Sequence, residues 1–155
     1  MEFTTLSTGN IDLLSNPLIG ALVRLPSQAI HRRLVSGLNA AGFDDLRLPH
    51  IAVLQFPGPD GCRPGELAER AGMSKQAMNQ LLESMERLGY LTRSASPEDG
   101  RARIVHFTPR GEAAWQTIIE VLYEVEAEWS ATLGAERFGQ LKALLTEVFH
   151  SDLIR

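Results

Sequence analysis

Apolar residues recur at helical spacing along most of this 155-residue chain, but after Gly89 the pattern changes to two short strand-like runs. The strand-like runs, 90–94 and 101–108, are joined by a turn that contains proline, aspartate and glycine. The segments with helical spacing are 16–41, 48–56, 65–71, 74–88, 109–133 and 138–148. This order predicts a mainly α protein with a small two-stranded β-wing followed by two helices.

Proline and glycine mark where the predicted helices are interrupted. Pro26 predicts a kink or a break inside the first helical segment, because proline lacks an N–H group and clashes with the preceding turn. Residues 57–61 read Pro-Gly-Pro-Asp-Gly and predict a loop. Pro64 suits the first turn of the next helix, Gly72 supplies its terminator, and Ser74 can cap the helix that follows.

The segment after the wing carries two apolar seams of the kind that pack helices together. Thr108 can cap a helix that has Pro109 at its first position. Five apolar residues of this helix step by 3, 4, 3 and 4 positions: Trp115, Ile118, Leu122, Val125 and Trp129. Gly134 interrupts the pattern, and residues 138–148 repeat it. The two seams offer more apolar surface than one small lobe covers, which predicts a homodimer.

The distribution of charge restricts where nucleic acid could bind. Fifteen Lys and Arg against nineteen Asp and Glu give a formal net charge of -4, so a nucleic-acid surface has to be local. Residues 63–110 hold eight Lys or Arg against six acids, whereas residues 111–136 hold six glutamates and no Lys or Arg. We therefore expect a DNA-binding surface within 63–110, and expect the helix after the wing to face away from phosphates.

Several classes of function find no support in the sequence. The single cysteine, Cys62, cannot form an internal disulfide, and the four histidines are scattered, so we expect no metal site. No GxSxG, Walker or GxGxxG motif is present, so we expect no catalytic residue and no cofactor. The apolar runs are too short to span a membrane and no secretory signal is recognisable, so we expect a cytoplasmic protein without a membrane partner.

Residues 65–88 have the spacing of a helix-turn-helix. Ala68 lets two helices approach, Gly72 accepts the positive φ of the turn, and Met78 and Leu81 hold the second helix against the first. The residues predicted to face outward on the second helix are Ser74, Lys75, Gln76, Asn79 and Gln80. Amides pair with adenine in the major groove, and lysine reaches guanine or phosphate. The set is suited to reading DNA, although a merely solvated helix face has similar composition.

The turn between the two strand-like runs carries a second candidate contact with DNA. Arg101 lies at its tip, Asp99 can brace it, and Arg103 follows on the same face of the strand. Arginine on a narrow hairpin can enter a minor groove and respond to its width and negative potential. An ordinary turn with solvated charges is the alternative.

Residues 46–111 resemble the winged helix-turn-helix of the MarR family of bacterial transcriptional regulators. The resemblance rests on motifs that occur in the family's order: GELAERAG at 65–72, LGYL at 88–91, DGR at 99–101 and VHFTPRG at 105–111. It implies a winged helix-turn-helix DNA-binding lobe at 46–110. It also implies a helical dimerisation region formed by 12–45 and 111–155.

The resemblance further implies a function. The expected protein is a homodimeric transcriptional regulator, usually a repressor, that binds a pseudo-palindromic double-stranded DNA operator. The recognition helix would begin near Ser74, and Arg101 would be the wing arginine. A small aromatic or lipophilic effector would bind near His31, Val35 and Trp115.

Three other functions remain to be weighed. A winged-helix module that docks proteins would not need the polar residues at 74–80. A redox-sensing regulator could use Cys62 with Arg63 beside it, although a small residue without a redox role is the simpler interpretation. The chain could also be the dimerisation lobe of an enzyme such as a methyltransferase, but 155 residues leave no room for a catalytic domain.

Overall fold

The protein is known from a computed structural model that describes residues 16–55, 60–96 and 102–154. In these ranges the chain forms six α-helices, one three-stranded sheet and a final 3-10 turn. The elements in chain order are α1 (Ile19–Ala40), α2 (Leu48–Gln55), β1 (Asp60–Cys62), α3 (Pro64–Arg70), α4 (Lys75–Arg87), β2 (Leu91–Ala95), β3 (Arg103–Phe107), α5 (Pro109–Leu133), α6 (Ala135–His150) and η1 (Asp152–Ile154). The predicted class, mainly α with a small β-wing, is confirmed.

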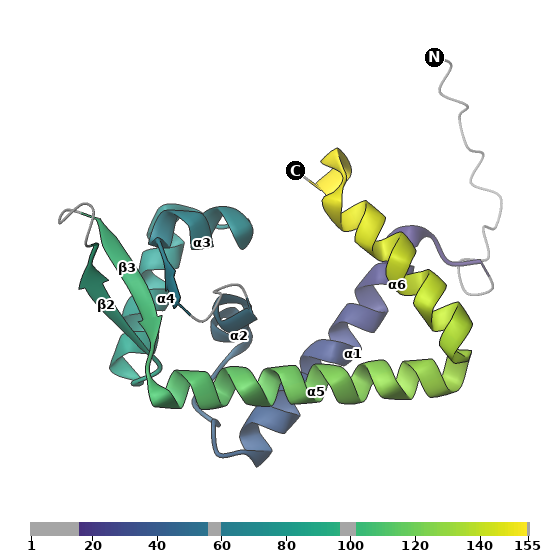
Figure 1. Cartoon of the computed structure of the whole chain (residues 1–155), viewed down its shortest axis with the longest axis horizontal. Coiled ribbons are helices and arrows are strands. Elements are labelled where there is room, and N and C mark those ends of the chain that lie inside the picture. Colours follow the sequence, from purple (N-terminus) through teal and green to yellow (C-terminus); the bar gives the residue numbers. More distant parts are fainter. Residues whose placement is uncertain (1–15, 56–59, 97–101, 155) are drawn as a thin grey trace.

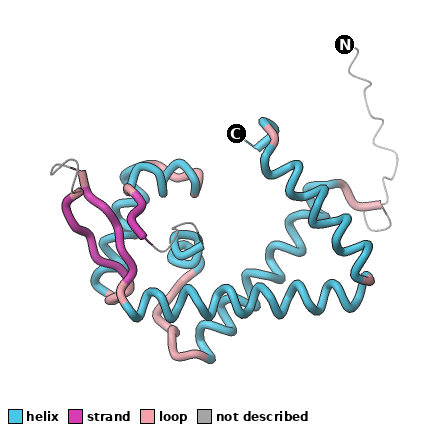
Figure 2. The backbone as a smooth tube through the Cα atoms, viewed as in Figure 1, coloured by secondary structure: helices cyan, strands magenta, loops and turns pink. Residues whose placement is uncertain are grey.

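The long helix α5 organises the molecule. A lobe built from α2, α3, α4 and the sheet lies at its N-terminal end, and α6 folds back from its C-terminal end (Figure 1). Figure 2 shows the strands gathered within the lobe. Helix α1 packs across α5, and a side chain at Gly37 would bring its Cβ within 2.5 Å of Val121 Cγ2. Glycine at this position therefore lets the two helices approach closely.

The sheet has one strand more than the sequence predicts. Its order is β1-β3-β2, and both pairings are antiparallel. Residues 57–61 were expected to be a loop, but Asp60 and Gly61 belong to β1, which pairs with the outer edge of β3. Gly61 adopts a φ of +81° where the register shifts, a conformation that glycine tolerates. The strand forms because β3 offers unpaired backbone N–H and C=O groups along this edge. No pattern in the local sequence therefore predicts it.

The first helical segment is one helix and not two. Of the kink or break predicted at Pro26, the break does not occur, because Pro26 lies inside the continuous helix α1. Proline removes a single backbone hydrogen bond, and the remaining bonds of the helix persist on either side of it. Leu34 and Leu38, after the proline, are buried in the core and hold this half of α1 in place.

A single apolar core joins the lobe to α1 and α5. Its fully buried large side chains come from eight elements and connecting segments: Leu34, Leu38, Leu46, Ile51, Leu54, Leu67, Met78, Leu82, Met85, Tyr90, Leu91 and Ile118. This shared core holds the lobe on the end of α5. Within the described ranges, no helix has the length and apolar character needed to cross a bilayer.

Candidate nucleic-acid interface

The turn between α3 and α4 has the geometry that the sequence predicts. Gly72 adopts a φ of +62°, and its N–H donates to Glu69 O at 3.1 Å. The N–H of Met73 then donates to Ala68 O at 2.9 Å, which closes the end of α3. Ala68 and Met78 are both buried where the two helices meet. Residues 64–87 therefore form a helix-turn-helix.

The residues predicted to contact DNA lie on the exposed side of α4. Ser74 is the N-cap, and its Oγ accepts a hydrogen bond from the Ala77 N–H at 3.1 Å. Lys75, Gln76, Asn79 and Gln80 are all exposed, as is Ser74 itself. The opposite side of the helix is buried through Met78, Leu82 and Met85. The structure thus brings the five residues together on one rigidly supported surface.

An ion pair fixes α4 to the sheet. Arg93 on β2 donates from Nε to Glu86 Oε2 at 2.8 Å, and both side chains are only partly exposed. The carboxylate of Glu86 and the guanidinium of Arg93 therefore neutralise each other. This contact holds the C-terminal half of α4 against the sheet.

The wing is described only in part. Arg103 is exposed at the start of β3, opposite Ala95 of β2. Asp99 and Arg101 lie outside the described residues, so the proposed bracing of Arg101 by Asp99 stays a prediction.

A cluster of three side chains connects the lobe to the rest of the molecule. The Tyr90 hydroxyl donates to Asp45 Oδ1, and Arg110 Nη2 donates to Asp45 Oδ2 at 2.9 Å and to the Tyr90 hydroxyl oxygen at 3.1 Å. The Arg110 guanidinium also lies 4.7 Å from the centre of the Tyr90 ring. Burial of the hydroxyl, followed by its hydrogen bond to Asp45, raises the pKa of Tyr90. We call these residues the junction cluster.

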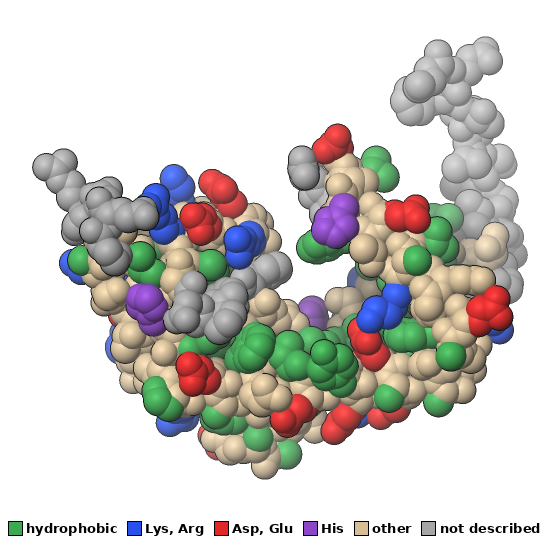
Figure 3. All heavy atoms as spheres, in the orientation of Figure 1, with side chains coloured by type: hydrophobic (Ala, Val, Ile, Leu, Met, Phe, Trp, Pro, Cys, Tyr) green, Lys and Arg blue, Asp and Glu red, His purple; other side chains and the backbone are tan. Residues whose placement is uncertain are grey.

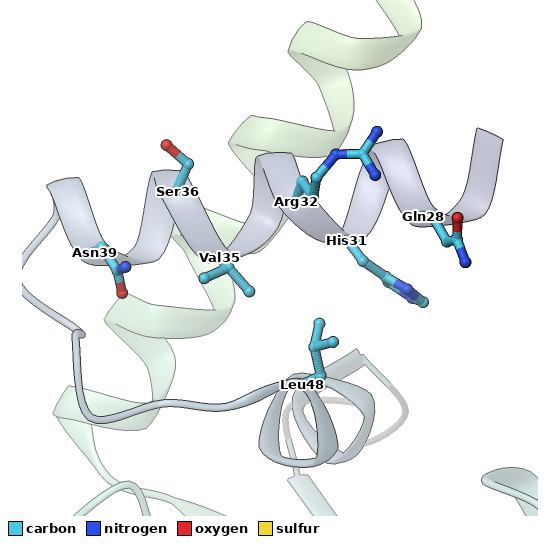
Figure 4. A pocket seen from close by; sticks show the side chains of 7 residues that line it. All are labelled: Gln28, His31, Arg32, Val35, Ser36, Asn39 and Leu48. Carbon is cyan, nitrogen blue, oxygen red and sulfur yellow. The ribbon is translucent and has the colours of Figure 1, made fainter. Parts of the chain in front are cut away.

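A cavity of about 500 Å³ lies between α1 and α2 (Figure 4). His31 and Val35 extend from α1 toward Leu48 on α2 in this view. The remaining lining residues are polar or charged: Gln28, Arg32, Ser36 and Asn39. Trp115, which was expected beside His31 and Val35, instead lines a separate groove with Phe107 and Pro109. Two of the three expected effector residues are therefore brought together.

Cys62 lies in β1 with little access to solvent. Its side chain is 8% exposed, and Arg70 Nη1 donates to its Sγ at 3.7 Å. Oxidation of a thiol depends on its exposure, so this burial disfavours a role in redox sensing. Across the described part of the chain, no three His, Cys, Asp or Glu side chains form a group that could hold a metal ion.

Comparison with known proteins identifies the family. The family model described as MarR family matches residues 45–102. The HTH-type transcriptional repressor Rv2887 of Mycobacterium tuberculosis is 31% identical over 104 residues, which cover 66% of this chain and 75% of that protein. The chain belongs to the MarR family. It is a transcriptional regulator of the winged helix-turn-helix type.

Solved structures of other regulators share the MarR-family fold found here. The repressor CouR, solved on a 23-mer DNA duplex, aligns with a TM-score of 0.72 and 20% identity over 93% of this chain and 100% of that chain. The regulator PcaV of Streptomyces coelicolor, in complex with its natural ligand, aligns with a TM-score of 0.65 and 22% identity over 92% and 98% of the two chains. At this level of identity the likeness concerns the fold.

Two exposed residues of α4 were not among the predicted contacts of this MarR-family chain. Glu83 and Arg87 continue the exposed surface beyond Gln80. Helical spacing alone places them there, since they follow Gln76 by seven and eleven positions. The junction cluster was also missed, because Asp45 and Arg110 are 65 positions apart in the sequence.

Proposed function

We propose that this MarR-family regulator is a homodimeric repressor that binds a pseudo-palindromic duplex. Helix α4 enters the major groove, and the wing reaches the flanking minor groove. The observation that carries this proposal is the exposed, amide-rich surface of α4, which starts at a capped N-terminus and rests on a buried apolar side. The same polar surface disfavours a module that docks proteins.

The proposed contacts follow from the chemistry of each side chain. Gln76, Asn79 and Gln80 carry amides that can pair with adenine through its N6 and N7 atoms. Lys75, in the first turn of α4, can reach guanine or a phosphate, and the helix N-terminus favours the same negative charge. Arg103 extends from the wing, and we assign the minor-groove contact to it together with Arg101, which Asp99 would brace.

The proposed dimer rests on apolar surface that one copy leaves uncovered. Large apolar side chains that are 44–74% exposed occur on the first turns of α1 and on the second half of α6: Leu18, Ile19, Leu22, Val23, Leu25, Leu144, Leu145, Val148 and Phe149. The start of α1 lies at the end of the molecule remote from the lobe, and α6 folds back from the end of α5 so that its second half stands across the gap from α3 (Figure 1). A second copy of the chain would cover these surfaces. The interface would then be formed by the proposed dimerisation region, residues 12–45 and 111–155.

Charge on α5 does not oppose this dimer. Glu124 and Glu128 pair with Arg33, and Glu126 pairs with Lys142 of α6 at 2.8 Å. The side chains of these glutamates are 43–65% exposed, so they face solvent while they pair with basic side chains of α1 and α6. Repulsion between the two copies is reduced accordingly.

The cavity between α1 and α2 is the proposed effector site. Val35 and Leu48 offer apolar surface for a ring, while His31 and Arg32 offer donors for an acidic or carbonyl group. CouR of Rhodococcus jostii RHA1 has been solved with p-coumaroyl-CoA, so a regulator of this fold can hold an aromatic ligand. The space-filling view shows a hollow between the lobe and α6 with hydrophobic side chains along α5 (Figure 3). We propose that a small aromatic or lipophilic effector bound near this hollow releases the DNA.

Selection of bound duplexes from a random pool tests the proposal. We expect a two-half-site consensus with half-site centres about one helical turn, roughly 34 Å, apart. Sedimentation of the protein at micromolar concentration should show twice the 17.1 kDa mass of one chain. Selection of no sequence, or a monomer that fills each selected site alone, would contradict the proposal.

A further inference from the structure

The exposed surface of α4 carries an acid that the contacts proposed above do not use. Gln76, Gln80, Glu83 and Arg87 follow one another at spacings of four, three and four residues. These spacings place the four side chains in one stripe along the helix, because an α-helix repeats every 3.6 residues. All four are exposed. A duplex that contacts Gln76 and Gln80 along this stripe therefore also faces Glu83.

The carboxylate of Glu83 has no hydrogen-bond or ion-pair partner among the residues that the structure describes. Glu86, the next acid of α4, differs in this respect because Arg93 holds it. A bare carboxylate near DNA is repelled by the phosphates and weakens binding to every sequence. A base that donates a hydrogen bond to it offsets that loss, and other bases do not.

We propose that Glu83 is a specificity-determining residue that accepts a hydrogen bond from the N4 amino group of a cytosine in the major groove. The inference rests on the proposed function of α4 as the reading helix. An ionised carboxylate can only accept, and cytosine presents a donor in the major groove. Guanine presents two acceptors, thymine presents one, and adenine places its N7 acceptor beside its N6 donor. Cytosine is therefore the base that suits Glu83.

The length of helix between Gln76 and Glu83 gives the position of this cytosine. Seven residues of α-helix rise about 10.5 Å. Base pairs are stacked about 3.4 Å apart, so this rise corresponds to about three base pairs where the helix follows the groove. We expect the Glu83 contact about three base pairs from the base whose preference depends on Gln76.

The test compares four proteins in selection from random duplexes: the wild type, Glu83→Ala, Glu83→Gln and the control Glu120→Gln. Glu120 is exposed on α5 and makes its side-chain contact with Gln116 of the same helix. Its replacement changes the net charge by the same amount without touching α4. Each protein is then titrated against the duplex that the wild-type protein selects. Variants of this duplex with a single altered base pair are titrated at the same salt concentration.

We expect Glu83→Ala to reduce the preference for cytosine at one position of each half-site by about five- to thirty-fold, which is about 1 to 2 kcal/mol. Its affinity for random DNA should rise, because a negative charge is removed. Glu83→Gln should shift the preference at the same position toward adenine, since an amide pairs with adenine through two hydrogen bonds. Glu120→Gln should select the wild-type sequence.

Two results would overturn the inference. Equal strengthening of all duplexes by both Glu83 variants, with unchanged base preference, would mean that Glu83 only repels phosphates. Variants that behave as the wild type does would mean that Glu83 lies outside the interface. Both results leave the proposed function standing, whereas failure of the wild type to select any sequence rejects that function itself.

Discussion

Replacing Tyr90 by phenylalanine removes a single hydroxyl group from the junction cluster. That hydroxyl donates to Asp45 and accepts from Arg110, so the replacement breaks two hydrogen bonds that join three separate segments of the chain. The ring of Tyr90 is fully buried and phenylalanine keeps its shape, so the packing around it is preserved. The measured change in stability therefore reports the hydrogen bonds.

The expected loss follows from the partners of the hydroxyl. A hydrogen bond to a charged group contributes about 1.5 to 3 kcal/mol to stability. Arg110 is partly exposed and also reaches Asp45 directly at 2.9 Å, so the carboxylate keeps one partner after the replacement. We expect Tyr90→Phe to reduce the free energy of unfolding by about 2 kcal/mol. In a chain of this size the midpoint of thermal unfolding should fall by about 4 to 8 °C.

Urea unfolding at fixed protein concentration measures the effect, with Tyr123→Phe as the matched control. Tyr123 lies on α5 with 68% of its side chain exposed, and within the described residues its hydroxyl has no hydrogen-bond partner. The control should unfold as the wild type does. The reasoning about the junction cluster is refuted if Tyr90→Phe and Tyr123→Phe have the same midpoint.

The same pair of proteins should differ in their dependence on pH. The pKa of Tyr90 is raised in the folded protein, so its stabilising contribution is complete below the unfolded value of about 10. As the pH rises above that value, the unfolded chain loses its proton first and the contribution of Tyr90 declines. The difference in stability between the wild type and Tyr90→Phe should therefore shrink above about pH 10.

Four further replacements test other parts of the structure. Gln76→Ala and Asn79→Ala should each weaken binding to the selected duplex more than binding to random DNA, because neutral amides release no counterions, and equal losses on both would contradict direct reading. Gly111→Ala should lower the free energy of unfolding by about 3 kcal/mol. Its Cβ would lie 2.0 Å from the Tyr90 carbonyl oxygen, so an unchanged urea midpoint would show that the backbone can move apart there. Leu22→Glu places a charge on the exposed apolar surface of α1 and should shift sedimentation toward the monomer, and an equally stable dimer would exclude this surface from the interface.

The helix-turn-helix could be predicted because its signals are local. Gly72 is needed for the positive φ of the turn, and Ser74 caps the next helix through an atom three residues away. Of the apolar positions predicted where the two helices meet, Ala68 and Met78 are buried and Leu81 is partly buried against the same core. Each of these features depends on residues that are close in the sequence. The residues on the exposed surface of α4 could therefore be predicted from the sequence.

The features that the sequence did not reveal depend on pairings between distant segments. Strand β1 forms only because β3 presents an open edge to it. Gly61 belongs to the Pro-Gly-Pro-Asp-Gly sequence at 57–61, which predicts a loop and not a strand. Helical spacing places Trp115 on a seam of α5 but does not tell which segment faces it, so its separation from His31 could not be foreseen. Pro26 is a strong local signal that the rest of α1 overrides.

The 25 residues of α5 make it a lever about 37 Å long, with the lobe at one end and the proposed dimer contacts at the other. A rotation of about 5° at the dimer end would displace the far end by about 3 Å, which is close to the 3.4 Å spacing of base pairs. Such a tilt of α5 would therefore move α4 by about one base-pair step along a bound duplex. The rigidity of this single helix converts a slight tilt into a mismatch of register with DNA.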